Sequence, residues 1–188
     1  MVKVVAGMRQ YDIEVLEGDG RTTWSVEPRA EQQPGTIHIP ADLRDWVSPA
    51  TLKEWVDLEI AKLNWQHPGV AEYIRAHTGQ HPRSMLALLA FAYAGAVFGS
   101  EEIVQACRGN RLPPSNGSMD VPFAQELRNF RRSNRRLLEE VLSGVFLKAI
   151  TARLNLDPNR PSTELLQDLR DRAMERLDIA RHMDAMDC

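Results

Sequence analysis

The chain has 188 residues, a formal net charge of -3 and a charged fraction of 26%. With 43% hydrophobic residues, this composition is typical of a globular protein and excludes both wholesale disorder and a generally basic nucleic-acid packaging protein. The charge is uneven, because residues 108–136 carry seven basic and two acidic side chains, whereas the flanking segments are neutral or acidic. One island of charge +5 therefore lies in an otherwise acidic protein.

Residues 1–40 predict a β-hairpin extension. Apolar and polar side chains alternate over residues 11–15 and again over residues 23–26, and a turn rich in Gly and Asp lies between them. This pattern is typical of an antiparallel hairpin with one buried face. Because an isolated hairpin is only marginally stable, we expect it to pack on the rest of the chain or on a partner.

Helical periodicity dominates from residue 41 onward. Ser48-Pro49 is a helix start signal, Pro82 opens an apolar helix that runs to about Phe98, and Gly99-Ser100 starts a further short helix. The apolar stretch is shorter than the roughly 20 residues that cross a bilayer, so we expect a buried helix and no membrane association. Together these signals predict a mainly α fold, a helical bundle with a helix-turn-helix-like arrangement plus the small hairpin.

A long helix is predicted from about Pro122 to Leu154, with a bend near Gly144. Its arginines recur at helical spacing and, at about 100° per residue, gather on one side, next to an apolar stripe that would face the core. Guanidinium and amide groups so arranged predict contacts to the phosphates and base edges of double-stranded DNA. The candidate DNA-binding residues are Arg128, Asn129, Arg131, Arg132, Asn134, Arg135 and Arg136, with Arg108 and Arg111 from the preceding loop.

The same arginines also fit a solvated helix face or a surface for an acidic protein. Two glutamates follow the last two arginines at helical spacing, but the first three arginines have no acidic neighbour three or four positions away. Residues 157–188 predict a separate C-terminal amphipathic helix, whose apolar stripe suits either packing within the chain or a homodimer seam. A protein–protein interaction module therefore stays open as the alternative function.

Patterns for catalysis and metal binding are weaker. His77 and His81 lie four residues apart, but Gly79 and Pro82 interrupt a helix there, and together with Cys107 they make no spaced zinc-type set. No glycine-rich phosphate loop follows a strand. We therefore predict a protein that is not an enzyme and has no catalytic residue, metal site or cofactor. The absence of a disulfide framework and of a signal-peptide pattern predicts a cytoplasmic location.

Two motifs between Pro82 and about Ile150 carry a family resemblance. The first is a proline, a leucine-rich helix with an aromatic residue near its end, a glycine–serine step and a helix ending in Ala106-Cys107-Arg108. The second is Leu127-Arg128-Asn129-Phe130-Arg131-Arg132. Together they resemble the N-terminal region of bacterial insertion-sequence transposases of the DDE type. The resemblance implies a helical DNA-binding domain over residues 41–156, such as the one that recognises transposon ends in that family.

The family's catalytic domain, an RNase H-like sheet with three metal-binding carboxylates, follows the arginine-rich helix. Here residues 151–188 predict another helix instead, so we expect no transposase catalysis. The resemblance thus implies a non-catalytic DNA-binding protein, either a regulator or a truncated product of a mobile element. We expect its DNA affinity to fall steeply with salt and to be abolished, without unfolding, when Arg131 and Arg132 are both replaced by alanine.

Overall fold

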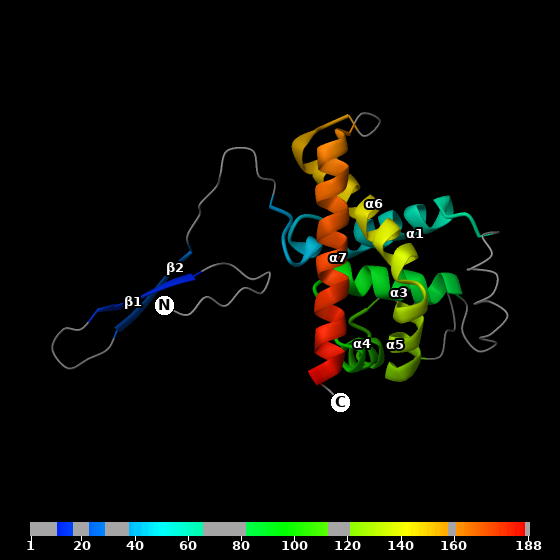
Figure 1. The fold of residues 1–188 in the computed structure, drawn as a ribbon, viewed down its shortest axis with the longest axis horizontal. Coiled ribbons are helices and arrows are strands. Elements are labelled where there is room, and N and C mark those ends of the chain that lie inside the picture. Colours follow the sequence, from blue (N-terminus) through cyan, green and yellow to red (C-terminus); the bar gives the residue numbers. More distant parts are fainter. Residues whose placement is uncertain are drawn as a thin grey trace. The chain divides into compact units, whose positions relative to one another are not determined.

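The computed structural model describes residues 11–16, 23–28, 38–65, 82–112, 121–157 and 161–186. The chain divides into two compact units, Met1–Ala41 and Asp42–Cys188, and each is described by itself. In the first unit, strands β1 (Tyr11–Leu16) and β2 (Thr23–Pro28) pair antiparallel (Figure 1). A hairpin with one buried face stays a prediction, because no side chain of either strand is among those described.

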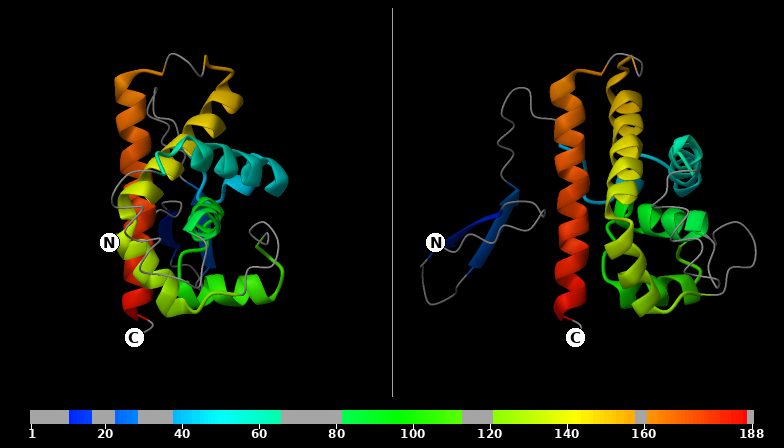
Figure 2. Two further views of the ribbon diagram at one scale, coloured as in Figure 1. Left: turned by 90° about the vertical axis from the view of Figure 1, so that its right-hand side faces the viewer. Right: turned by 45° about the vertical axis from the view of Figure 1, so that its right-hand side comes forward.

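The second unit is mainly helical, which confirms the predicted fold class at this level (Figures 1 and 2). A short 3-10 turn, η1 (Leu43–Asp45), precedes six α-helices among the described residues. These are α1 (Pro49–Lys62), α3 (Pro82–Ala94), α4 (Ser100–Arg108), α5 (Ala124–Ser133), α6 (Arg135–Leu154) and α7 (Thr163–Met186). None of the described helices is both long enough and apolar enough to span a membrane.

Helix α3 provides the centre of the core, as its apolar composition predicts. Every side chain from Leu88 to Ala94 is buried, and α3 packs against α1, α5, α6 and α7. Full burial of a leucine or phenylalanine side chain contributes about 1.5–3 kcal/mol relative to exposure, so this helix supplies a large share of the stabilisation. On α5, Leu127 and Phe130 are also buried, as the predicted apolar stripe requires.

Helices α6 and α7 lie side by side and run in opposite directions (Figure 2). The α7 helix starts where Ser162 Oγ accepts a hydrogen bond from the Leu165 backbone N–H at 3.1 Å. Its apolar stripe is buried within the chain and consists of Leu169, Ala173, Leu177 and Ala180. Of the two roles that the sequence leaves open for this stripe, the structure shows packing within the chain.

The predicted continuous helix from residue 122 to residue 154 is wrong at one point. Asn134, with φ -121° and ψ 25°, separates α5 from α6. Its side chain is buried, and its amide donates to the Phe130 carbonyl at 3.0 Å, alongside the Asn134 backbone N–H, which donates to the same carbonyl at 2.9 Å. Near Gly144 the helix is not interrupted, since α6 continues from Arg135 to Leu154, and a bend there stays a prediction. Because the helix is interrupted at Asn134, the spacing of 100° per residue does not carry over from the arginines of α5 to those of α6.

Candidate nucleic-acid interface

Arg131 is buried, with 8% of its surface exposed, and takes part in a network that joins four helices. Its guanidinium donates to the Tyr93 hydroxyl of α3 at 3.0 Å and forms an ion pair with Asp184, near the end of α7. The Asp184 carboxylate also accepts from the backbone N–H of Ser100 at 2.8 Å and from its hydroxyl at 2.9 Å, which satisfies the first turn of α4. We call Tyr93, Ser100, Arg131 and Asp184 the Asp184 node.

The electrostatics of this node follow from burial and from its ion pair. Burial raises the pKa of the Tyr93 hydroxyl to about 12, although the Arg131 charge acts in the opposite direction. Burial acts to lower the pKa of Arg131, but Tyr93 and Asp184 outweigh that effect and the pKa is raised. Arg131 therefore stays charged, and its charge is compensated inside the protein.

Carboxylates from other helices hold two further arginines of the predicted set. The Arg128 guanidinium lies 3.5 Å from Glu101 and 3.8 Å from Asp184, and its side chain is 17% exposed. Arg135 Nη2 donates to Asp178 Oδ1 of α7 at 2.9 Å, although the two residues lie 43 positions apart in the chain. Arg128, which has no acidic residue at helical spacing, thus finds its acidic neighbours elsewhere in the fold, and Arg135 pairs with α7.

These contacts bear on the predicted DNA-binding set. Arg131 and Asn134 are both buried, so their side chains are not available at the surface of this structure. Replacing Arg131 by alanine would remove the cation that Asp184 and Tyr93 contact inside the protein, so the double alanine change at residues 131 and 132 would not isolate DNA binding from folding. Arg108 and Arg111 are exposed at the end of α4 and just after it, where Arg111 lines a hollow of about 330 Å³ together with Glu102.

Helix α5 exposes a row of amide and guanidinium groups. Gln125, Asn129 and Arg132 are exposed and lie within about 60° of one another at 100° per residue. Arg136 is also exposed, in the first turn of α6 just beyond the break at Asn134. Gln125 Nε2 donates to Asn129 Oδ1 at 3.0 Å, and within the described residues neither Arg132 nor Arg136 forms an ion pair. We call Gln125, Asn129, Arg132 and Arg136 the α5 stripe.

The sequence pattern identified three members of this stripe and missed Gln125. It also missed Phe123, which is 71% exposed just before α5 and whose backbone N–H donates to Glu126 Oε2 at 2.8 Å. A glutamate three residues after the start of a helix is a recognisable signal for this hydrogen bond. That signal would have placed the start of α5 correctly.

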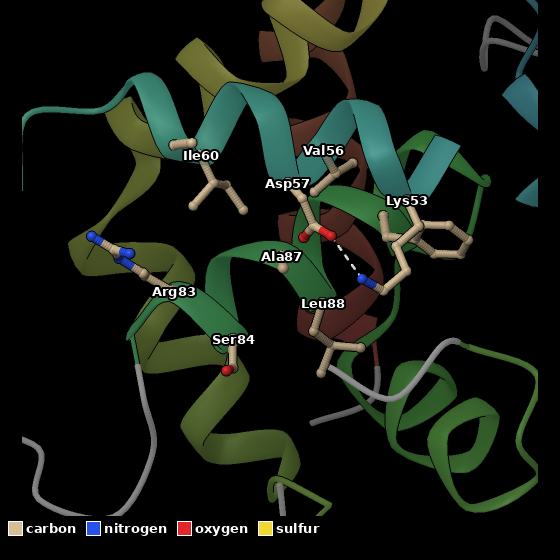
Figure 3. A pocket seen from close by; sticks show the side chains of 10 residues that line it. Lys53, Val56, Asp57, Ile60, Arg83, Ser84, Ala87 and Leu88 are labelled. Atoms are coloured by element: carbon tan, nitrogen blue, oxygen red, sulfur yellow. Dashed lines mark hydrogen bonds and ion pairs between the residues drawn. The ribbon is translucent and has the colours of Figure 1, made fainter. Parts of the chain in front are cut away.

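A pocket of about 210 Å³ lies between α1 and α3 (Figure 3). Val56, Ile60 and Leu88 give it apolar walls, and an ion pair of 2.7 Å between Lys53 and Asp57 crosses its rim. The other rim cation, Arg83, stacks over the Trp65 ring at 4.6 Å. The charged groups at this rim therefore already have partners within the chain.

The weaker metal and nucleophile candidates gain no supporting geometry. His77 and His81 lie outside the described residues, and among those described no group of three or more His, Cys, Asp or Glu side chains could hold a metal ion. Burial raises the pKa of the Cys107 thiol, which disfavours the reactive thiolate.

Comparison with protein-family models, with curated proteins and with solved structures found no match for this chain. The resemblance to insertion-sequence transposases therefore stays a prediction. The function has to be argued from the α5 stripe and from the helices that hold it.

Proposed function

We propose that the helical unit is a non-catalytic module that binds double-stranded DNA through the α5 stripe. The observation that carries the proposal is the row of two exposed amides and one exposed guanidinium on α5, whose opposite side is fixed by buried Leu127 and Phe130. These groups grip phosphates and read base edges, and no carboxylate interrupts their row. A firmly docked helix is also what recognition in the major groove requires.

In this proposal α4 and α5 belong to the helix-turn-helix-like arrangement that the transposase resemblance implies, and α5 enters the groove. Arg128 and Arg131 position α5 through their carboxylate partners, Arg135 holds the start of α6 in the same way, and none of the three grips DNA itself. Such a module is sufficient for the DNA binding of a regulator. It is also sufficient for a product of a mobile element that lacks the nuclease domain.

Arg132 and Arg136, the two exposed arginines of the α5 stripe, set the expected salt dependence. Each phosphate neutralised contributes about -0.9 to the slope of log affinity against log salt concentration. Arg132 and Arg136 alone would give a slope of about -2, whereas all five arginines of the predicted cluster would give about -4.5. We therefore expect modest affinity for random-sequence DNA, strongest at low salt.

Fluorescence anisotropy with a labelled random-sequence duplex tests the proposal on the full chain. Replacing Arg132 and Arg136 together by alanine should weaken binding about tenfold or more at low salt and bring the salt slope close to zero. The matched control replaces Arg170 and Arg181 of α7, which are also exposed, and so removes the same charge. Equal losses in both double variants, or no duplex affinity of the unmodified chain, would contradict the proposal.

A protein–protein interaction module is the second candidate. Leu154, Leu156 and Leu166 favour it, since all three are exposed on either side of the segment that joins α6 to α7. This function predicts no duplex affinity even at low salt. It also predicts assembly that increases with protein concentration, or capture of an acidic protein partner, as measured by light scattering.

A further inference from the structure

The hydrogen bond between Gln125 and Asn129 orients two exposed amides on the α5 stripe. Each amide has a carbonyl oxygen with two acceptor positions and an NH₂ group with two donors. The 3.0 Å bond from Gln125 Nε2 uses one acceptor position of Asn129 Oδ1. Asn129 keeps a second acceptor position and both donors of Nδ2, all on an exposed side chain. Its amide is therefore held in one orientation with a donor and an acceptor side by side.

A paired donor and acceptor match one base edge in the major groove. Adenine presents N7 as an acceptor beside its N6 amino donor, whereas guanine presents two acceptors, N7 and O6. An asparagine amide can donate to adenine N7 and accept from N6 at the same time. The planar guanidinium of Arg132 matches the two acceptors of guanine. The two side chains thus differ in the base that they complement.

We infer that the α5 stripe reads base sequence, with Asn129 recognising adenine and Arg132 recognising guanine; this inference rests on the proposed DNA-binding function. Gln125 is a positioning residue that orients Asn129, and Arg136 contacts phosphate. Asn129 and Arg132 are separated by about 4.5 Å along the helix axis, since each residue rises about 1.5 Å. Base pairs are stacked about 3.4 Å apart, so the two bases should be neighbours in the site.

Selection of bound sequences from a pool of duplexes with a randomised centre tests the inference on the full chain at low salt. The unmodified protein should enrich a short motif in which an adenine lies next to a guanine. Asn129→Ala should lower discrimination at the adenine about tenfold, while Arg136→Ala should weaken binding evenly and leave the motif unchanged. Gln125→Leu should weaken the adenine preference several-fold with unchanged thermal stability, which a merely structural role would not produce.

Asn129→Asp provides a second test, because it keeps the acceptors and removes both donors. A carboxylate accepts from the cytosine N4 amino group, so the preference at that position should change from adenine to cytosine. A motif that is absent in the unmodified protein, or that is unaltered in Asn129→Ala and Asn129→Asp, would overturn the inference and leave DNA binding intact. If no duplex in the pool is retained, the proposed function fails and the inference fails with it.

Discussion

Arg131 and Arg132 are neighbours in the sequence and have opposite surroundings. On a helix, the directions of successive side chains differ by about 100°, so one of two neighbours can point to the core while the other points to solvent. Arg131 contacts Asp184 and the Tyr93 hydroxyl, whereas Arg132 is exposed. Removing one partner of a buried ion pair destabilises a protein by about 3–5 kcal/mol, whereas exposed substitutions usually change stability by less than about 0.5 kcal/mol. Of the two arginines, only Arg132 is therefore suited to contact DNA.

The Tyr93 hydroxyl predicts a loss of stability at high pH. Its pKa is about 12 in the folded protein, where burial disfavours the phenolate, against 10.0 in an exposed tyrosine. Between these two values the unfolded chain loses the proton first, so unfolding becomes easier as the pH rises. The full effect is about 2–3 kcal/mol, reached near pH 12.

Urea unfolding of the unmodified chain and of Tyr93→Phe across this pH range measures the effect. The phenylalanine variant removes this titration and keeps all the others, including that of Arg176, whose pKa burial lowers. The difference in unfolding free energy between the two proteins should shrink as the pH rises from about 9 to about 12. A difference that stays constant with pH would show that Tyr93 does not titrate in this way.

At the scale of the elements, local signals predicted the helix starts. Ser48 Oγ accepts from the Thr51 N–H at 3.1 Å, and Pro82 and Ser162 mark the starts of α3 and α7. The break at Asn134 was not predictable from spacing, because apolar residues recur at helical intervals on both sides of it. The carboxylates that hold Arg131 and Arg135 lie 53 and 43 positions away, beyond the reach of any helical spacing rule. Most of the fold was thus readable from the sequence, whereas the division of the arginines was not.

The packing of α1 on α6 depends on a glycine. Glu59 interrupts the apolar spacing of α1, and its carboxylate lies over Gly144, where a Cβ atom would collide with the carboxylate and approach Glu59 Cγ to 2.9 Å. The carboxylate is also held by Lys62 at 2.8 Å and lies 3.5 Å from Lys148, so Glu59 cannot move away without losing these partners. The charged residue on α1 and the glycine on α6 therefore form a matched pair.

The effect of Gly144→Ala on the free energy of unfolding should depend on the residue at position 59. Alanine is favoured over glycine inside a helix by about 1 kcal/mol, and we expect that gain in a Glu59→Ala background. In the unmodified chain the collision should cancel the gain or reverse it. Urea unfolding of the two single variants and the double variant gives the coupling energy directly. Equal effects of Gly144→Ala in both backgrounds would show that the close approach has no energetic consequence.

At the scale of the whole molecule, contacts of the basic island with α4 and α7 neutralise part of its charge inside the protein. Asp178 and Asp184 of α7, with Glu101 of α4, lie against Arg128, Arg131 and Arg135. Three of the seven arginines of the island thereby join α5 and α6 to α7. The exposed ones are Arg108, Arg111, Arg132 and Arg136, so net charge along the sequence overstates the charge available for binding.

The last turn of α7 should control the stability of the helical unit. Met186 is 73% exposed, so a chain shortened by residues 186–188 should melt within about 1 °C of the full chain. A chain shortened by residues 184–188 also loses Asp184, which leaves Arg131 buried without its carboxylate and Ser100 without its acceptor. The loss of these contacts should destabilise the protein by about 3 kcal/mol or more, and so lower the melting temperature by roughly 10 °C.

Asp184→Ala in the full chain controls for the new terminal carboxylate and should show a similar decrease. Thermal unfolding followed by circular dichroism measures all four proteins, and equal melting temperatures for the two shortened chains would refute the role assigned to Asp184.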